Sequence, residues 1–395
     1  MTTELALELQ PHYSDFKVDK RILLSGHSHQ AWPNVAKDGL LECYQDAALH
    51  VDDKWSNAFA KAQRVKDFYS SLLGEPDAEI TLGASTHELL LRFLSDLNCF
   101  KQPTSRAVKI VTTDGEFHSM RRQLNRFKQL NMHIEIVPVV PSETLAQRLI
   151  DKIDAQTDAV MISAVFYGTS EIFRDVGAVA QHAHSHNVPC LVDTYHALNV
   201  VPFDIKSWQL EHAFIVSGGY KYCQAGEGNC MMRVPKGYNG SPIITGWYAE
   251  FSALNQAPGQ VGYGPGASAF DGATYDPSSH YRAAAVFDFF AEQQLTPTKL
   301  RAINQQQIAQ LKNGITTVPK LADAFTLAAH PLENNGGFLA LTTAHASQWV
   351  AKLHEHGIQT DSRGSQLRLG PAPYISQAQI DQALNIMEDI VGNLS

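Results

Sequence analysis

The chain lacks the features that mark membrane, secreted and nucleic-acid-binding proteins. No stretch of its 395 residues approaches the roughly 18 uncharged apolar residues that a membrane-spanning helix needs. The N-terminal MTTELALELQPHYSD contains neither the basic nor the apolar segment of a secretory signal. Asp and Glu (40) outnumber Lys and Arg (31), and the net charge of -9 would repel nucleic acids and anionic membranes. We therefore expect a soluble, cytoplasmic protein that binds neither.

Cysteine is also scarce, and no metal is expected. The five cysteines form no CxxC pair and no zinc-binding spacing, and their odd number argues against a disulfide framework. Histidines are denser in QHAHSHN, but only His182 and His186 share a helix face, and a third ligand is not evident. A solvated helix end explains this cluster.

The chain does contain a long alternation of strand and helix patterns. Seven short β-type runs occur between residues 76 and 235: AEITLG, AVKIVTT, HIEIVPVV, AVMISAVF, VPCLVD, AFIVSGG and NCMMRV. Amphipathic segments such as HELLLRFLSDL, with apolar residues at helical spacing, lie between them. This alternation predicts an α/β domain with a mainly parallel sheet.

The remainder of the chain has a different composition. Residues 236–280 are dense in Gly, Pro, Ser and Tyr, which predicts a long ordered loop region. Helical periodicity resumes at AAAVFDFFAEQQL and leads to strand candidates GGFLALTT and LRLG and a last helix in ISQAQIDQALNIMEDIV. We predict a large domain over residues 50–280 and a small α+β domain formed by residues 1–49 and 281–395.

Two motifs in the α/β region indicate a cofactor. Lys221 follows the strand candidate AFIVS among several glycines, where a flat cofactor can approach the backbone and a deprotonated amine can form an imine. Asp193 ends the apolar run VPCLVD, and its carboxylate could keep a pyridinium nitrogen protonated. A helix cap or turn is the alternative role for Asp193. His196, three residues later, could stack on the cofactor or hydrogen-bond around it.

A third motif indicates a phosphate site. Ser85 and Thr86 stand at a strand-to-helix junction in GASTHELLLRF, and the free N–H groups of a helix N-terminus suit a phosphate. The alternative is an N-cap with Glu88 in a partial capping box.

In this order and spacing, the motifs resemble the class V aminotransferase group of fold-type I pyridoxal 5'-phosphate (PLP) enzymes, and within it kynureninases most. The resemblance runs from LLSGHSHQAWP through GAST, GEFHSM, SAVFYGTSEIFRDV, DTYHALNVVPFDI and GGYKY to LRLGPAPY. It implies a three-layer α/β/α large domain, a small α+β domain, and PLP held as a Schiff base on Lys221. It also implies a homodimer with the active site at the interface.

The resemblance further implies a set of cofactor contacts. Ser85, Thr86 and Tyr220 would bind the phosphate, and Phe117 would stack on the pyridine ring. The full set is Ser85, Thr86, Phe117, Asp193, His196, Tyr220 and Lys221, with Trp247 and Thr274 supplied by the partner subunit.

The resemblance also indicates substrate contacts. Arg368 in QLRLG would anchor the substrate carboxylate, a task that suits a bidentate guanidinium. His27 and Ser28 lie in the segment that borders the substrate, although a turn with satisfied histidines is about as good an interpretation. Catalysis would fall to Lys221, the general base at Cα, together with Asp193 and His196.

Three departures from the kynureninase pattern bear on the substrate, and one of them is Phe166, which stands where an asparagine is common. The chain reads Phe117-His118-Ser119-Met120 where kynureninases carry an acidic residue in an F-P-[ST]-D run. Asn199 replaces a glycine, a change that a left-handed backbone tolerates. Whether kynurenine is accepted stays open.

The sequence thus predicts a PLP-dependent enzyme acting on a small amino acid, a kynureninase-like hydrolase or lyase that cleaves Cβ–Cγ or performs β-elimination. The alternatives are a class V aminotransferase and, less favoured, a catalytically idle scaffold. A cysteine desulfurase ranks low, because only Cys223 and Cys230 follow Lys221 and both are too near it in sequence.

Overall fold

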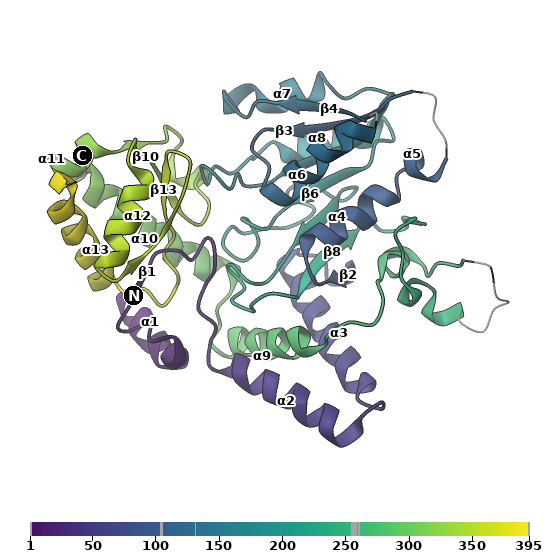
Figure 1. Cartoon of the computed structure of the whole chain (residues 1–395), viewed down its shortest axis with the longest axis horizontal. Coiled ribbons are helices and arrows are strands. Elements are labelled where there is room, and N and C mark those ends of the chain that lie inside the picture. The colour runs from purple at the N-terminus through teal and green to yellow at the C-terminus, as the bar shows by residue number, and fades with distance from the viewer. Residues whose placement is uncertain (1, 103–105, 131, 254–258, 260, 394–395) are drawn as a thin grey trace.

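The computed structural model describes residues 2–102, 106–130, 132–253, 259 and 261–393, and Figure 1 shows them arranged in two lobes. The larger lobe is built on a seven-stranded sheet whose strands fall on the seven predicted runs. These strands are β2 (Glu79–Gly83), β3 (Val108–Thr113), β4 (Met132–Val137), β5 (Thr157–Ser163), β6 (Cys190–Asp193), β7 (Phe214–Ser217) and β8 (Cys230–Val234).

The sheet is mainly parallel, as predicted. Its strand order is β2-β8-β7-β6-β5-β3-β4, and each neighbouring pair from β7 to β4 runs parallel. Strand β8 is antiparallel to both of its neighbours. The carboxyl ends of five parallel strands therefore meet at one edge, where ligands bind in open α/β sheets.

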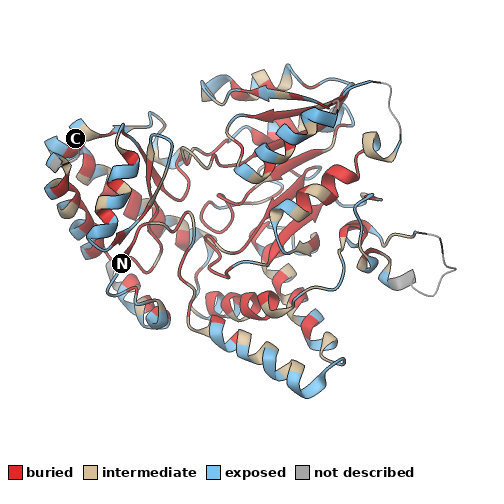
Figure 2. Ribbon diagram, viewed as in Figure 1, coloured by how far each residue is buried: buried red, intermediate tan, exposed pale blue. Residues whose placement is uncertain are grey.

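Both faces of this sheet are buried, because successive side chains of a strand point to opposite sides. In β5, Ala159 and Met161 belong to one core cluster, and Val160 and Ile162 belong to the other. Apolar side chains of α4 (Thr86–Ser95) and α6 (His118–Phe127) complete the first cluster; those of α3 (Trp55–Leu72), α7 (Leu145–Ile150) and α8 (Val176–Ser185) enter the second. The result is a three-layer α/β/α arrangement, and Figure 2 shows its buried strands between helices with exposed outer faces.

The smaller lobe has an antiparallel sheet of order β12-β13-β10-β9. Its strands are β9 (Thr326–Leu327), β10 (Leu339–Thr342), β12 (Asp361–Arg363) and β13 (Gln366–Leu369). Its helices are α10 (Pro297–Thr317), α11 (Pro319–Ala324), α12 (Ala346–Glu355) and α13 (Gln377–Ile390). The predicted α+β character and the last helix are confirmed.

The N-terminal segment contacts both lobes. Its β1 (Ile22–Leu23) pairs in parallel with β11 (Ile358–Gln359), and α1 (Thr2–Leu9) contacts α13. By contrast, α2 (Val35–His50) packs along α9 (Ser278–Glu292), which also meets α3 below the larger sheet (Figure 1). The division at residues 50 and 280 stays a prediction.

The predicted loop region contains two short 3-10 helices, η4 (Trp247–Ala253) and η5 (Gly266–Phe270), before α9 begins at residue 278. Residues 254–258 and 260 lie outside the described part of the chain. No helix among the described residues combines the length and apolar content needed to cross a membrane.

Candidate active site

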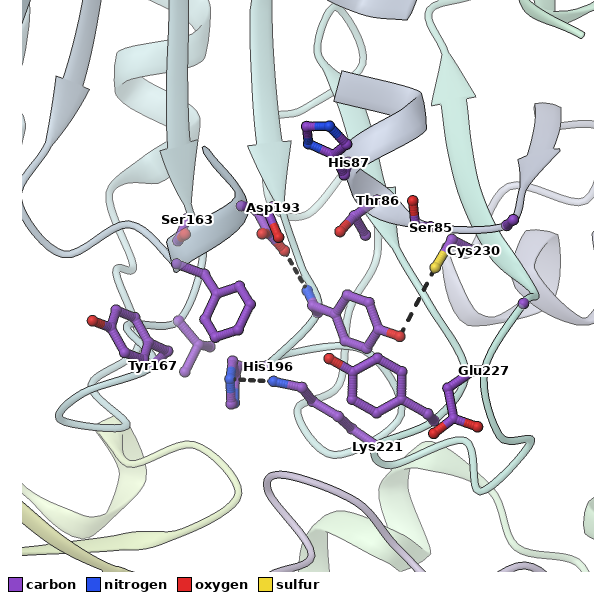
Figure 3. Close-up of a pocket in the computed structure, with 17 residues that line it drawn as sticks. Ser85, Thr86, His87, Ser163, Tyr167, Asp193, His196, Lys221, Glu227 and Cys230 are labelled. Atoms are coloured by element: carbon purple, nitrogen blue, oxygen red, sulfur yellow. Dashed lines mark hydrogen bonds between the residues drawn. The ribbon is translucent and has the colours of Figure 1, made fainter. Parts of the chain in front are cut away.

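A pocket lies at the carboxyl edge of the parallel strands. Ser163 ends β5, Asp193 ends β6, and these two residues are paired in the sheet register. The structure gathers the seven cofactor residues predicted on this chain around the pocket (Figure 3): Ser85, Thr86, Phe117, Asp193, His196, Tyr220 and Lys221.

Lys221 presents its amine at the floor of this pocket. The Nζ atom lies 5.3 Å from the Phe117 ring centre, 5.2 Å from that of Tyr195 and 5.8 Å from that of Tyr220. The side chain of Lys221 is buried, and burial lowers the pKa of its amine to about 7, although the negative charge of Asp193 acts to raise it. Much of the amine is therefore neutral near neutral pH, the form that attacks a carbonyl.

His196 contacts the lysine directly. Its Nε2 lies 2.5 Å from Lys221 Nζ (Figure 3), and burial followed by the positive charge of Lys221 lowers the pKa of His196 well below its usual value. The ring is therefore neutral. Its Nδ1 is buried and has no hydrogen-bond partner among the described residues, so it is free to meet a polar group of a ligand.

Asp193 is buried beside the same space. Its Oδ1 accepts a hydrogen bond of 2.8 Å from the Tyr195 backbone N–H, which is the turn considered as an alternative from the sequence. Burial raises the pKa of Asp193, and the hydrogen bond from Tyr195 and the charge of Lys221 oppose that rise. Asp193 therefore both forms this turn and lines the pocket.

Helix α4 brings its N-terminus to the pocket. Ser85 is the N-cap, and its hydroxyl accepts from the Glu88 backbone N–H at 3.2 Å. The Glu88 carboxylate accepts in turn from the N–H of Ala84 at 2.9 Å, one residue before the cap. The capping alternative is thus realised in part, while Ser85 and Thr86 also line the pocket.

These groups fit PLP by their chemistry. A buried amine with a lowered pKa, an unpartnered imidazole nitrogen, aromatic rings, an acid and a helix N-terminus surround one space. Taken in the same order, these groups suit the aldehyde, a polar ring substituent, the ring face, the ring nitrogen and the phosphate of PLP.

The predicted substrate residues lie beside this pocket and do not line it. Arg368 is 3% exposed; its Nε and Nη2 donate to Asp361 at 2.8 and 2.5 Å, and its Nη1 donates to the Tyr167 carbonyl at 2.7 Å. The Nε2 of His27 lies 2.7 Å from Asp361 Oδ1, and burial lowers the pKa of His27 to about 4. Ser28 lies 3.2 Å from the ring of its neighbour His29. Roles in substrate binding stay predictions.

Sequence reasoning missed Asp361, although a signal existed. Asp361 and Arg368 are equally distant from the turn Gly364-Ser365, and Gly364 has a φ of 56°. Residues equally spaced about a two-residue hairpin turn face each other across the strands. The spacing could therefore have predicted the pair.

Glu116 was also missed, and nothing local in the sequence indicates it. It is 1% exposed and accepts from the Thr113 hydroxyl at 2.7 Å and from the Ser163 backbone N–H and hydroxyl at 3.2 and 2.5 Å. Burial raises the pKa of Glu116 to about 7. This network ties the segment that carries Phe117 to the ends of β3 and β5.

Trp247 and Thr274 lie outside the cofactor pocket of their own chain. The Trp247 indole donates to the Thr274 hydroxyl at 3.3 Å, and Thr274 lines a neighbouring cavity of about 670 Å³. That cavity shares Ala84, Glu227 and Gly228 with the cofactor pocket. Their contribution from a partner subunit stays a prediction.

A further sequence inference is confirmed at Asn199. Asn199 has a φ of 66°, the left-handed backbone that its exchange for glycine required.

Cys223 and Cys230 are buried, and burial raises the pKa of both thiols, to about 12 for Cys230. Neither is a ready nucleophile, although Cys230 lines the pocket. The described residues hold no group of three potential metal ligands.

Comparison with known sequences identifies relatives. A profile of the aminotransferase class-V family matches residues 93–383. The chain is 21% identical over 256 residues to a kynureninase from Shouchella clausii, covering 60% of this chain and 57% of that protein. It is 24% identical over 210 residues to kynureninase 2 of Emericella nidulans, covering 50% and 42%. The chain thus matches about half the length of each kynureninase.

Solved structures show the same fold at low identity. A variant of the cystine C–S lyase C-DES, with glycine covalently linked to its PLP cofactor, has a TM-score of 0.82 at 16% identity over 96% of this chain and 99% of that one. A cysteine desulfurase from Escherichia coli has a TM-score of 0.79 at 15% identity over 99% of both chains. Since the family profile spans most of the sequence, the chain belongs to the class V aminotransferase family of PLP-dependent enzymes with the fold-type I architecture.

Proposed function

We propose that the protein is a hydrolase or lyase of the kynureninase type that acts on a small amino acid. The observation that carries this proposal is the contact of 2.5 Å between the buried, readily neutral Lys221 amine and His196, within one pocket that also holds Asp193. The kynureninase relatives favour a hydrolase or lyase over an aminotransferase.

Different residues of the chain would hold different parts of the cofactor. When bound, PLP supplies an electron sink for negative charge at Cα. Asp193 would hold a proton at the pyridine nitrogen, and Ser85 and Thr86 would hold the phosphate with the N–H groups of α4. Phe117 would cover one face of the ring.

Lys221 would hold the cofactor and then move the proton at Cα. A base with a pKa near 7 suits this task, since it can both take and return a proton at neutral pH. His196 would set the position of the amine through its Nε2, and it is itself neutral. The aromatic rings around Nζ would exclude water from the transfer.

We also propose that the working form is a homodimer. Large apolar side chains are exposed on the loop region after β8, among them Ile243, Ile244, Trp247 and Phe251. Such a patch favours a protein interface. A monomeric mass in solution at micromolar concentration would contradict the dimer.

The test begins with the purified protein and added PLP. Wild-type protein should develop the visible absorbance of bound cofactor, and Lys221→Ala should not. Amino acids are then screened for spectral change, and products are identified by mass spectrometry. Products in which the amino-acid substrate has been cleaved support the proposal. Accumulation of the pyridoxamine phosphate form, with the carbon skeleton of the substrate intact, would favour an aminotransferase.

A further inference from the structure

Helix α6 carries a cationic groove beside the cofactor pocket. The groove encloses about 450 Å³ and is lined by His118, Arg121, Arg122, Asn125 and Arg126. The sequence contains no Asp or Glu between Glu116 and Glu135, although the whole chain has a net charge of -9. Positive charge is therefore concentrated on this helix against the overall balance.

This charge is not compensated within the described part of the chain. No carboxylate there forms an ion pair with Arg121, Arg122 or Arg126. The side chain of Arg121 instead donates from Nη2 to His118 Nδ1 at 2.7 Å. Partial burial and then the charges of Arg121, Arg363 and Arg368 lower the pKa of His118. Arg363 and Arg368 of the smaller lobe are therefore near enough to His118 to add to the positive charge at this end of the groove.

A short chain of contacts joins the groove to the reactive amine. Lys221 Nζ lies 5.3 Å from the Phe117 ring, and the Phe117 and His118 rings are 5.3 Å apart. The His118 ring is 5.6 Å from that of Tyr167, and Tyr167 lines the cofactor pocket with Ser119 of α6. Phe117 and Ser119 line the cofactor pocket, and His118 between them lines the groove, so the two spaces adjoin at the N-terminus of α6.

Resting on the proposed function, we propose that this groove binds an anionic oxygen group at the far end of the substrate. The preferred substrates are then amino acids with a carboxylate or phosphate on the side chain. Guanidinium groups match both anions through paired N–H donors.

Matched pairs of amino acids test this proposal. The PLP-loaded protein is titrated with L-glutamate and L-glutamine, and with O-phospho-L-serine and L-serine, and dissociation constants are read from the visible spectrum of the cofactor. We expect the anionic member of at least one pair to bind about tenfold more tightly, which is 1.4 kcal/mol. The glutamate pair reports a carboxylate and the phosphoserine pair a phosphate. Added salt should reduce the preference.

Charge removal then locates the preference. The double variant Arg121→Gln with Arg122→Gln should bring the two members of the pair to equal affinity. Lys320→Gln on α11 removes one exposed positive charge of the other lobe and should leave the preference intact. The visible band of the cofactor should persist in all variants, which separates this test from the test of the proposed function.

Three results would overturn the proposal. The first is equal affinity of wild-type protein for both members of each pair. The second is a preference that the double variant retains. The third is that none of the four amino acids binds, while polyglutamate binds wild-type protein and not the double variant. That result would assign the groove to an acidic macromolecule. A visible band that persists in the double variant and in Lys320→Gln, and is lost in Lys221→Ala, would show that the cofactor site is intact in the variants compared.

Discussion

Asp361 and Arg368 face each other across the hairpin of β12 and β13, and the Asp361 carboxylate accepts two N–H groups of the Arg368 guanidinium. A third N–H goes to the Tyr167 carbonyl, so the chain itself uses three of the five donors of this arginine. Although burial alone raises it, the pKa of Asp361 is lowered by the hydrogen bonds from His27 and Arg368. Asp361 therefore orients Arg368, and a substrate carboxylate would meet only its remaining donors.

Replacing Asp361 should be costly for stability. Asp361→Ala leaves the guanidinium of Arg368 buried without its counter-charge, and we expect a loss of about 3 kcal/mol in the free energy of unfolding. Denaturant titration followed by circular dichroism measures it. Glu355→Gln, which breaks the exposed pair with Lys352, should cost less than about 1 kcal/mol. Equal effects of the two substitutions would contradict the role of Asp361.

The lowered pKa of Lys221 should govern cofactor uptake. Below pH 7 the amine is protonated and cannot attack the PLP aldehyde; above about 7 it is neutral. The rate at which apoprotein acquires the visible band should therefore rise through pH 7 and level off. An uptake rate that kept rising toward pH 10, as for an exposed lysine, would show that the amine is not desolvated in solution.

Glu116 should give the stability a pH dependence. The folded protein keeps a proton on Glu116 up to about pH 7, whereas the unfolded chain loses it near 4.5. The stabilising contribution of this group is thus present below pH 4.5 and is lost as the pH rises through about 7. Glu116→Gln cannot ionise and should flatten the fall of the unfolding free energy across this window.

Denaturant titrations at several pH values measure this slope. Asp193, whose pKa is also raised by burial, keeps its contribution of the same sign in the variant, so only part of the slope should vanish. An unchanged slope would mean that Glu116 is ionised in the folded protein below pH 7.

The cap of α4 should serve both folding and the cofactor. Ser85→Ala removes the acceptor of the Glu88 N–H and should cost about 1 kcal/mol of stability. It should also weaken PLP binding, because Ser85 lines the pocket. Thr296→Ala is the matched control, since Thr296 caps α10 in the other lobe in the same way. A similar loss of stability in both variants with unchanged PLP affinity in Ser85→Ala would leave Ser85 as a cap alone.

Local patterns in the chain were enough to place the elements and to indicate Lys221, Asp193 and Ser85 as candidate residues of a cofactor site. The seven strand runs are short and apolar, and amphipathic helices lie between several of them, so hydrophobic periodicity predicts the larger lobe. Asp193 and Ser85 follow from strand and helix ends, where parallel strands converge. Lys221 and His196 lie within a few residues of such ends, whereas Phe117 was indicated only by the resemblance to the family.

Contacts between distant segments depended on packing that no local pattern encodes. Glu116 meets Ser163 across 47 residues, and Arg368 meets Tyr167 across 201. The values of the Lys221 and Glu116 pKa follow from burial, which is a property of the assembled lobes. Hydrophobic periodicity determines whether a segment forms a helix or a strand. Contacts between segments far apart in the sequence depend on the packing of the whole folded chain.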